Sequence, residues 1–240
     1  MKLKLLLSVL VAAALTACGG GDESSPNADP QGFWSGPAST GYTVNTVILN
    51  TGEVWGVYSQ GATIWGALYG SATVSGQRVT VQGTDFNFAT NSASSGTLTG
   101  TLVPRSSLQL SSTSGVSTSL SYDASYETAA TAAAITGTWS FVGRSGAFEL
   151  VPESVTVDGT GSFTLSQADC TSSGSIVPRP GGKNIYDFNL TSVGSACALG
   201  YSTLSGVAYL DTTVSPNRFL ALGLTPSKND GLIVIGTKAP

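Results

Sequence analysis

The chain carries one pattern twice, and this duplication constrains the fold more than any other feature. Gly32-Phe33-Trp34-Ser35 heads the first copy and Gly137-Thr138-Trp139-Ser140 heads the second. The offset of roughly 105 positions returns later in the same order, in Asn50-Thr51-Gly52 with Val157-Asp158-Gly159, Ser59-Gln60 with Ser166-Gln167, and 96–100 with 202–206. Each copy therefore has the length of one small domain.

Within each copy, apolar and polar residues alternate over short runs that glycine-containing turns separate. This period of two is typical of antiparallel strands. A hairpin is predicted where Asp158-Gly159 joins two such runs, because Asp-Gly supplies the positive φ of a tight turn. The predicted strands begin at 34 and follow at 42–49, 54–58, 64–69, 79–88, 97–103, 108–110 and 119–126, then at 139–142, 154–157, 162–165, 174–177, 185–190, 202–210, 219–224 and 232–235.

Eight meandering strands leave two exposed sheet edges unless the sheet closes on itself. We therefore expect an all-β fold of two tandem antiparallel β-barrels with about eight strands each. A pair of β-sandwiches is the alternative. The expected domains are a first barrel over 32–128, a linker with one helical turn over 129–136, and a second barrel over 137–240.

The N-terminus has the order of a secretory signal: Lys2 and Lys4, an apolar run over 5–15, then small residues before Cys18. The run is shorter than the ~20 residues that span a bilayer. Leu15-Thr16-Ala17-Cys18 resembles the lipobox of bacterial lipoproteins. The resemblance implies that a signal peptide, 1–17, is removed and that Cys18 is acylated, palmitate included, to become the new N-terminus. The alternative is ordinary cleavage that leaves a free thiol. Residues 18–31 are rich in Gly, Ser, Asp, Asn and Pro, which predicts a flexible tether.

The Gly-x-Trp at the head of each copy resembles the opening motif of calycins, the lipocalin-like barrels. In calycins this tryptophan plugs the closed end, and a basic residue near the last strand packs on it. Lys238 fits that role in the second copy, whereas the first has no basic residue near Tyr126. The chain is also similar in architecture to lipid-anchored surface proteins with eight-stranded barrels, such as transferrin-binding and factor H-binding proteins. Neither resemblance transfers a functional residue.

The three cysteines divide into one plus two. With Cys18 assigned to the lipid, Cys170 and Cys197 are expected to pair in an oxidising compartment. In the chain-entropy model this crosslink stabilises the fold by roughly 3–4 kcal/mol. Two buried free thiols are the alternative.

The absence of histidine removes the usual general base and the preferred zinc ligand. The carboxylates lie mostly at turns and show no facing pair, so we expect no enzyme activity, no metal and no cofactor. Without the signal peptide the chain has 8 basic and 14 acidic residues, a net charge of −6. An acidic chain is not expected to bind nucleic acid.

The aromatic residues Trp55, Tyr58, Trp65 and Tyr69 are the tentative binding residues. Their two segments, 54–58 and 64–69, are apolar on both faces, whereas a half-buried strand is apolar on one. Strict alternation places Trp65 and Tyr69 on one face, with Ile64 and Leu68 on the other. The outer set either packs between the two barrels or forms a recognition patch, since Trp and Tyr dominate binding hot spots.

These observations favour a non-catalytic outer-membrane or surface lipoprotein that contacts a protein or glycan partner and reaches the membrane through its lipid. Gly19, rather than aspartate, follows the cysteine, which favours the outer membrane. One alternative is a lipocalin-like carrier of a small apolar ligand, because an eight-stranded barrel holds core side chains or one small ligand. Another is a periplasmic inhibitor or assembly factor that uses the loop with Arg179 and Lys183.

Overall fold

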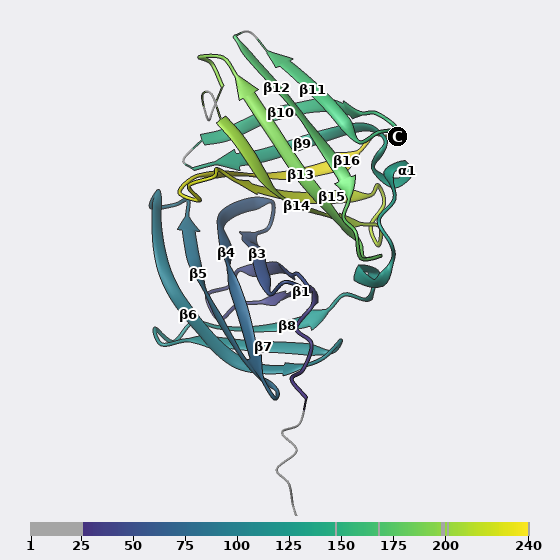
Figure 1. Ribbon diagram of the computed structural model, residues 1–240. Coiled ribbons are helices and arrows are strands. Elements are labelled where there is room, and N and C mark those ends of the chain that lie inside the picture. Colours follow the sequence, from purple (N-terminus) through teal and green to yellow (C-terminus); the bar gives the residue numbers. More distant parts are fainter. Residues whose placement is uncertain (1–25, 147, 168, 198–199, 201, 240) are drawn as a thin grey trace, which may run out of the picture.

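The computed structural model describes residues 26–146, 148–167, 169–197, 200 and 202–239. The first group of strands is β1 (Gly32–Pro37), β2 (Thr43–Ile48), β3 (Glu53–Gln60), β4 (Thr63–Ser75), β5 (Arg78–Asn87), β6 (Ser92–Val103), β7 (Ser107–Ser112) and β8 (Ser117–Tyr122). The second is β9 (Gly137–Ser145), β10 (Phe148–Val157), β11 (Ser162–Gln167), β12 (Cys170–Pro178), β13 (Ile185–Val193), β14 (Ser202–Asp211), β15 (Arg218–Leu224) and β16 (Gly231–Lys238). Two short helical turns, η1 (Ala124–Glu127) and α1 (Ala132–Ile135), lie between the groups (Figure 1).

Each group of eight strands forms a closed antiparallel barrel in which sequence neighbours pair with each other. In barrel 1, made of β1–β8, Trp34 and Ser35 of β1 pair with β8 to close the sheet. In barrel 2, made of β9–β16, the first and last strands pair along six residues. The predicted all-β fold of two tandem barrels is confirmed, and neither copy forms a sandwich. The strand predicted over 119–126 is shorter, since 124–127 form η1.

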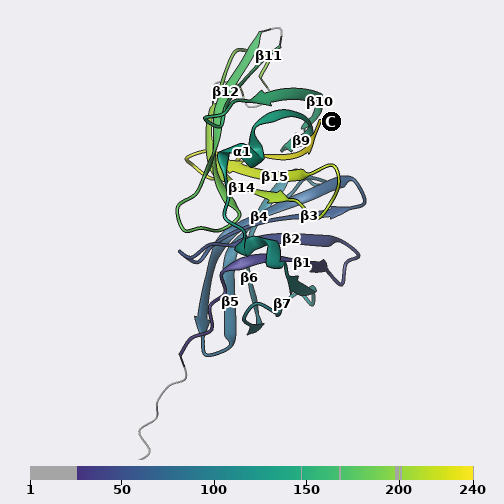
Figure 2. The ribbon, with the colours of Figure 1, turned by 90° about the vertical axis from the view of Figure 1, so that its right-hand side faces the viewer.

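The two barrels stack side against side (Figures 1 and 2), and a shared apolar cluster fills the space between them. Phe33 and Tyr209 belong to it, and their rings stack with centroids 3.9 Å apart. The cluster joins the outer faces of β1–β4 to those of β13–β16. Barrel 1 contributes Val47, Leu49, Trp55, Val57 and Ile64. Barrel 2 contributes Ile185, Val207, Leu222, Leu224 and Ile233. Both barrels therefore bury apolar side chains on two faces of these strands, which explains their doubly apolar sequences.

The connection between the barrels is docked onto barrel 2. Asp123 accepts a hydrogen bond from the Tyr209 hydroxyl at 2.8 Å, and the Asn184 amide N–H donates to the Tyr126 carbonyl at 2.9 Å. Glu127 accepts a hydrogen bond from Lys183 Nζ at 2.5 Å and another from the Tyr122 hydroxyl. These two hydrogen bonds hold the pKa of the Glu127 carboxyl below its usual value, and the bond from Lys183 has the larger effect.

The predicted hairpin forms between β10 and β11, but the positive φ lies at Gly161 rather than at Gly159. Gly161 has φ +85°, and its amide donates to the Asp158 carbonyl. The Asp158 carboxylate accepts hydrogen bonds from the backbone amides of Thr160 and Ser162. The turn is thus four residues long, and its last position carries the left-handed backbone, so the prediction of Gly159 is corrected.

A bulge between β3 and β4 corrects the predicted faces of the aromatic segment. Ser59 pairs with Ile64 and Tyr58 with Gly66, so Trp65 is an extra residue without a partner across the ladder. One inserted residue reverses the alternation after it. As a result Trp65 and Leu68 pack in barrel 1, whereas Ile64 and Tyr69 pack in the cluster between the barrels. The expectation that Trp65 and Tyr69 share a face is wrong.

Candidate functional site

The interior of barrel 2 contains a cavity of about 500 Å³. Its volume falls in the range of small-molecule sites, which are mostly apolar with a few placed polar groups. The polar side chains among its walls are Ser145, Glu149, Glu153, Gln167, Ser172 and Ser192. The apolar walls are Phe141, Leu150, Val155, Phe163, Leu165, Ile176, Phe188, Leu190, Phe219, Leu232 and Val234.

The same region of barrel 1 is filled by large aromatic side chains. Tyr58 is 8% exposed and packs with Trp65 and Tyr42 against the barrel 1 core. The two-residue turns after Gln60 and Gln167 align the β3–β4 hairpin with the β11–β12 hairpin. In this alignment Leu165 takes the position of Tyr58, and its ladder partner is Ser172. Barrel 2 is therefore hollow where its counterpart holds these three aromatic rings.

A tryptophan closes the opposite end of each barrel. Trp34 and Trp139 are fully buried, and each indole Nε1–H donates to the carbonyl four residues earlier, of Pro30 at 3.1 Å and of Ile135 at 2.7 Å. Lys238 Nζ lies 5.4 Å from the Trp139 ring and donates to the Ala134 carbonyl. In barrel 1 the Tyr122 ring packs edge-on against Trp34. Trp34 and Trp139 thus take equivalent buried positions in the two copies, and Lys238 packs on the second of them.

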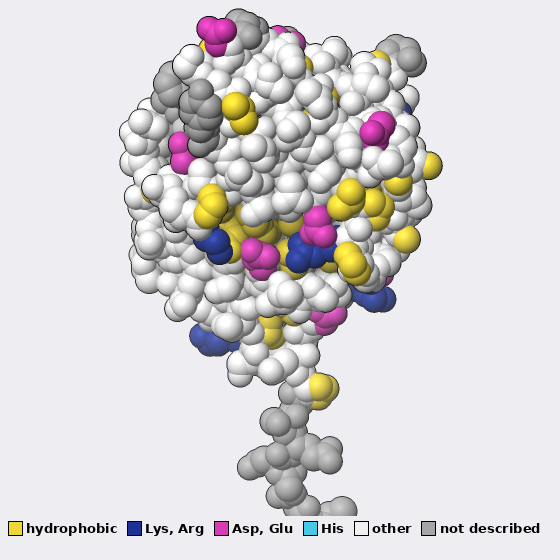
Figure 3. Space-filling model, turned by 45° about the horizontal axis from the view of Figure 1, so that its top comes forward, with side chains coloured by type: hydrophobic (Ala, Val, Ile, Leu, Met, Phe, Trp, Pro, Cys, Tyr) yellow, Lys and Arg dark blue, Asp and Glu magenta, His cyan; other side chains and the backbone are white. Residues whose placement is uncertain are grey.

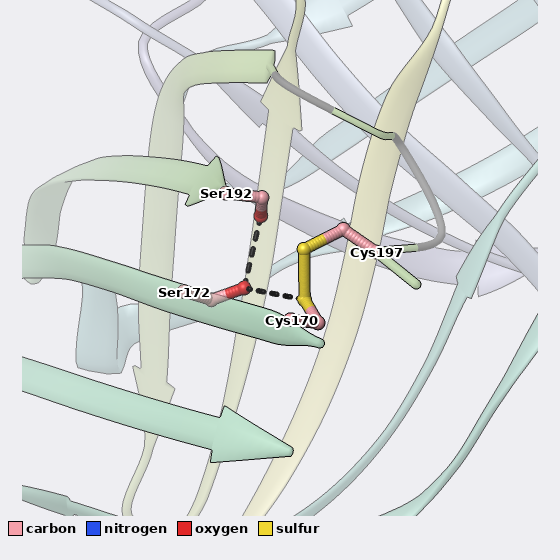
Figure 4. The surroundings of a disulfide bond; sticks show 4 residues. All are labelled: Cys170, Ser172, Ser192 and Cys197. Carbon is pink, nitrogen blue, oxygen red and sulfur yellow. Dashed lines mark hydrogen bonds between the residues drawn. A yellow bond between two sulfur atoms is a disulfide. The ribbon is translucent and has the colours of Figure 1, made fainter. Parts of the chain in front are cut away.

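The disulfide between Cys170 and Cys197 lies at the wall of the cavity and confirms the predicted pairing. It ties the start of β12 to the segment after β13 (Figure 4). Beside it, the hydroxyl of Ser172 lies 2.9 Å from that of Ser192 and 3.8 Å from Cys170 Sγ. The crosslink thus fixes one part of the cavity rim.

A partly buried tyrosine–aspartate pair lies inside barrel 1. The Tyr58 hydroxyl donates to Asp85 Oδ1 at 2.9 Å. Burial raises the pKa of the Asp85 carboxyl, and the hydrogen bond from Tyr58 offsets part of that rise. Burial and the neighbouring Asp85 also raise the pKa of Tyr58. The hydrogen bond satisfies both polar side chains within the aromatic core of barrel 1.

The four predicted binding residues do not form one surface. Trp55 is 6% exposed in the cluster between the barrels, and Tyr58 and Trp65 lie inside barrel 1. Tyr69 lies at the edge of the cluster, where its hydroxyl donates to Glu53 and contacts Lys228 Nζ. The packing of the two barrels against each other thus accounts for the apolar side chains on the outer face of segments 54–58 and 64–69. A binding role for these residues stays a prediction, with little accessible surface to carry it.

A hollow runs between the barrels on one face of the molecule. Figure 3 shows hydrophobic side chains gathered in its floor, with basic and acidic side chains on its rim. Tyr69 and Lys228 line the hollow, with Lys228 Nζ 4.3 Å from the tyrosine ring. Arg179 and Asp187 also line it and form an ion pair at 3.2 Å. Arg179 and Lys183, predicted at the tip of an inserting loop, both form ion pairs within the chain.

Other predicted features fall outside the described residues, namely the signal peptide 1–17, Cys18 and the first part of the tether. Within the described ranges, no three His, Cys, Asp or Glu side chains are grouped to hold a metal ion. No helix in those ranges has the length and apolar character needed to cross a bilayer.

The walls of the barrel 2 cavity were not among the site residues predicted from the sequence. The aligned copies contain one indication of this cavity, because the large Tyr58 of the first copy corresponds to the smaller Leu165 of the second. Phe163 and Leu165 also alternate in β11 with residues that are exposed. The strand pairing in the structure was needed to show that both side chains face the interior of their barrel.

No family model and no curated protein matches the chain. One solved structure, described as that of "a putative outer membrane protein" from Bacteroides fragilis, aligns with 90% of this chain and 98% of its own at 11% identity. The TM-score of this alignment is 0.24, so the match carries no argument about function.

Proposed function

We propose that the protein is a lipid-anchored protein of the bacterial cell envelope that binds one small apolar ligand inside barrel 2. The observation that carries the proposal is the apolar cavity of about 500 Å³, present in one copy of a duplicated barrel and filled in the other. A close-packed barrel gains stability from complete filling, so an apolar void is costly unless a ligand occupies it.

Two further observations support a binding role for barrel 2. The end opposite the cavity is sealed by Trp139 and Lys238, which leaves the site with a closed floor. The wall is apolar apart from a few hydroxyl, amide and carboxylate groups, as in sites for hydrophobic ligands. The proposed lipid anchor rests on Leu15-Thr16-Ala17-Cys18, and the proposed outer-membrane location rests on Gly19.

A substitution copied from barrel 1 tests the proposal. Leu165→Tyr installs in barrel 2 the side chain that fills barrel 1 at the corresponding position. We expect the purified wild-type chain to bind the neutral fluorescent probe N-phenyl-1-naphthylamine saturably, at one site. Leu165→Tyr should weaken this binding by about tenfold or more, because the tyrosine occupies the space of the probe.

Tyr58→Leu is the matched control, since it makes the reverse change in the barrel without the cavity. Once circular dichroism has shown that both variants are folded, Tyr58→Leu should leave probe binding by barrel 2 unchanged. Absence of saturable binding by the wild type, or equal binding by folded Leu165→Tyr, would contradict the proposed function.

A further inference from the structure

The wall of barrel 2 separates along one seam, between β10 and β11. Within the described residues these strands share one registered pair, Val157 with Phe163, next to the hairpin turn. Beyond it, among the residues that the structure describes, β11 pairs with β12 alone, along all six of its residues, and β10 pairs with β9 alone. Figure 2 shows β11 and β12 running together on one side while β10 curves away with β9.

The corresponding strands of barrel 1 have no such seam. β2 and β3 pair along six consecutive residues, from Thr43 with Ser59 to Ile48 with Val54. The two copies share their strand order, so the seam is specific to the copy that contains the cavity. An unpaired strand edge exposes backbone donors and acceptors, and proteins normally cover such edges.

The seam leads directly into the cavity. Glu153 and Val155 of β10 and Phe163, Leu165 and Gln167 of β11 all line it. Ser154, Thr156, Thr164 and Ser166, which alternate with them, are exposed on the outer face. The opening thus has an apolar inner side and a polar rim made of one carboxylate, one carboxamide and two backbone edges.

We infer that the β10–β11 seam is the entrance of the cavity and holds the head group of a single-chain amphiphile. This inference rests on the proposed function. The alkyl chain lies against Phe163 and Leu165, and the head group forms hydrogen bonds with the strand edges and Gln167. Glu149, which also lines the cavity, forms an ion pair with Arg144 at 3.6 Å. Glu153 therefore gives the rim its negative charge, which disfavours an anionic head group and favours a neutral or cationic one.

A disulfide across the seam tests the entrance. Ser154→Cys with Ser166→Cys places two exposed thiols opposite each other if pairing continues from Val157 and Phe163. Once this crosslink is verified by peptide mapping, we expect stopped-flow uptake of N-phenyl-1-naphthylamine to slow by about tenfold or more, because the side opening is closed. Thr43→Cys with Ser59→Cys, across the already paired β2 and β3, is the control and should leave the rate unchanged.

The outcomes separate the two proposals. Unchanged uptake by the crosslinked chain overturns the seam as entrance while leaving the ligand-binding function intact. Absence of binding by the wild-type chain overturns the proposed function, and the seam inference falls with it.

Competition between alkyl probes tests the head group. Dodecylamine, dodecanol and dodecanoate, each below its micelle-forming concentration, should displace the fluorescent probe, with dodecanoate weaker than dodecylamine by about tenfold. Glu153→Gln should narrow this difference, whereas Glu53→Gln, which changes a carboxylate in the hollow between the barrels, should not. Equal or tighter binding of dodecanoate by the wild type would overturn the head-group assignment.

Discussion

At the scale of single residues, the two barrels differ in what occupies equivalent positions. Tyr58 fills the interior of barrel 1 and donates a hydrogen bond to Asp85, whereas Leu165, at the position of Tyr58, leaves space in barrel 2. The filled arrangement has an electrostatic cost, because burial disfavours the charged form of Asp85 and raises its pKa. The unoccupied arrangement leaves space for a ligand. One copy thus serves as an internal reference for the other.

Asp85→Asn should stabilise the protein at neutral pH. A carboxyl whose folded-state pKa is raised contributes stability below its unfolded-state pKa and loses that contribution as the pH rises through the folded-state value. Asparagine imitates the neutral form and can still accept the hydrogen bond from Tyr58. Urea unfolding should therefore show a variant more stable than the wild type at pH 7, with the difference shrinking at about pH 3.5. A variant less stable by the same amount at both pH values would contradict this account.

At the scale of strands and turns, the sequence predicted which segments form strands and how they follow one another. Alternation and glycine-bearing turns located all sixteen strands, and the count of cysteines located the disulfide. Alternation did not reveal the bulge at Trp65, because an inserted residue leaves no mark in a segment that is apolar on both faces. It also did not reveal the β10–β11 seam, since each strand keeps its pattern when only one of its edges is paired.

The two glycines of the β10–β11 turn should respond differently to alanine. Gly161 has φ +85°, and a Cβ atom there would lie 2.3 Å from the Ile176 carbonyl oxygen. Gly159 has open space around it. Gly161→Ala should therefore lower the free energy of unfolding by about 1–2 kcal/mol or more, whereas Gly159→Ala should change it little. Thermal unfolding of both variants measures this difference. Equal losses of stability in the two variants would contradict the assignment of the strained backbone to Gly161.

At the scale of the whole molecule, the two barrels form one packed body rather than separate domains on a linker. Arg144 of β9 reaches across their interface, where its guanidinium donates to the carbonyls of Ile64 at 3.2 Å and Phe88 at 3.3 Å. It also lies 5.2 Å from the Phe88 ring. The sequence left open whether the outer apolar residues meet a partner or the other barrel, because that choice depends on how the barrels stack.

Arg144→Met should weaken the packing of the barrels against each other. The substitution keeps an unbranched apolar stem but leaves two carbonyls of barrel 1 without their donors, at a cost of about 1–3 kcal/mol. Differential scanning calorimetry should show a lower melting temperature or a single transition that splits into two. Arg218→Met removes an exposed ion pair with Asp211 within barrel 2 and should have little effect. Equal effects of the two variants would argue against a coupling role for Arg144.

Native mass spectrometry of the intact chain, extracted from its own membrane, tests the central claim most directly. We predict one apolar adduct per chain in the wild type and in Tyr58→Leu, and its loss in folded Leu165→Tyr. A wild-type chain without any adduct that also binds no added amphiphile would contradict the claim that barrel 2 is a ligand site.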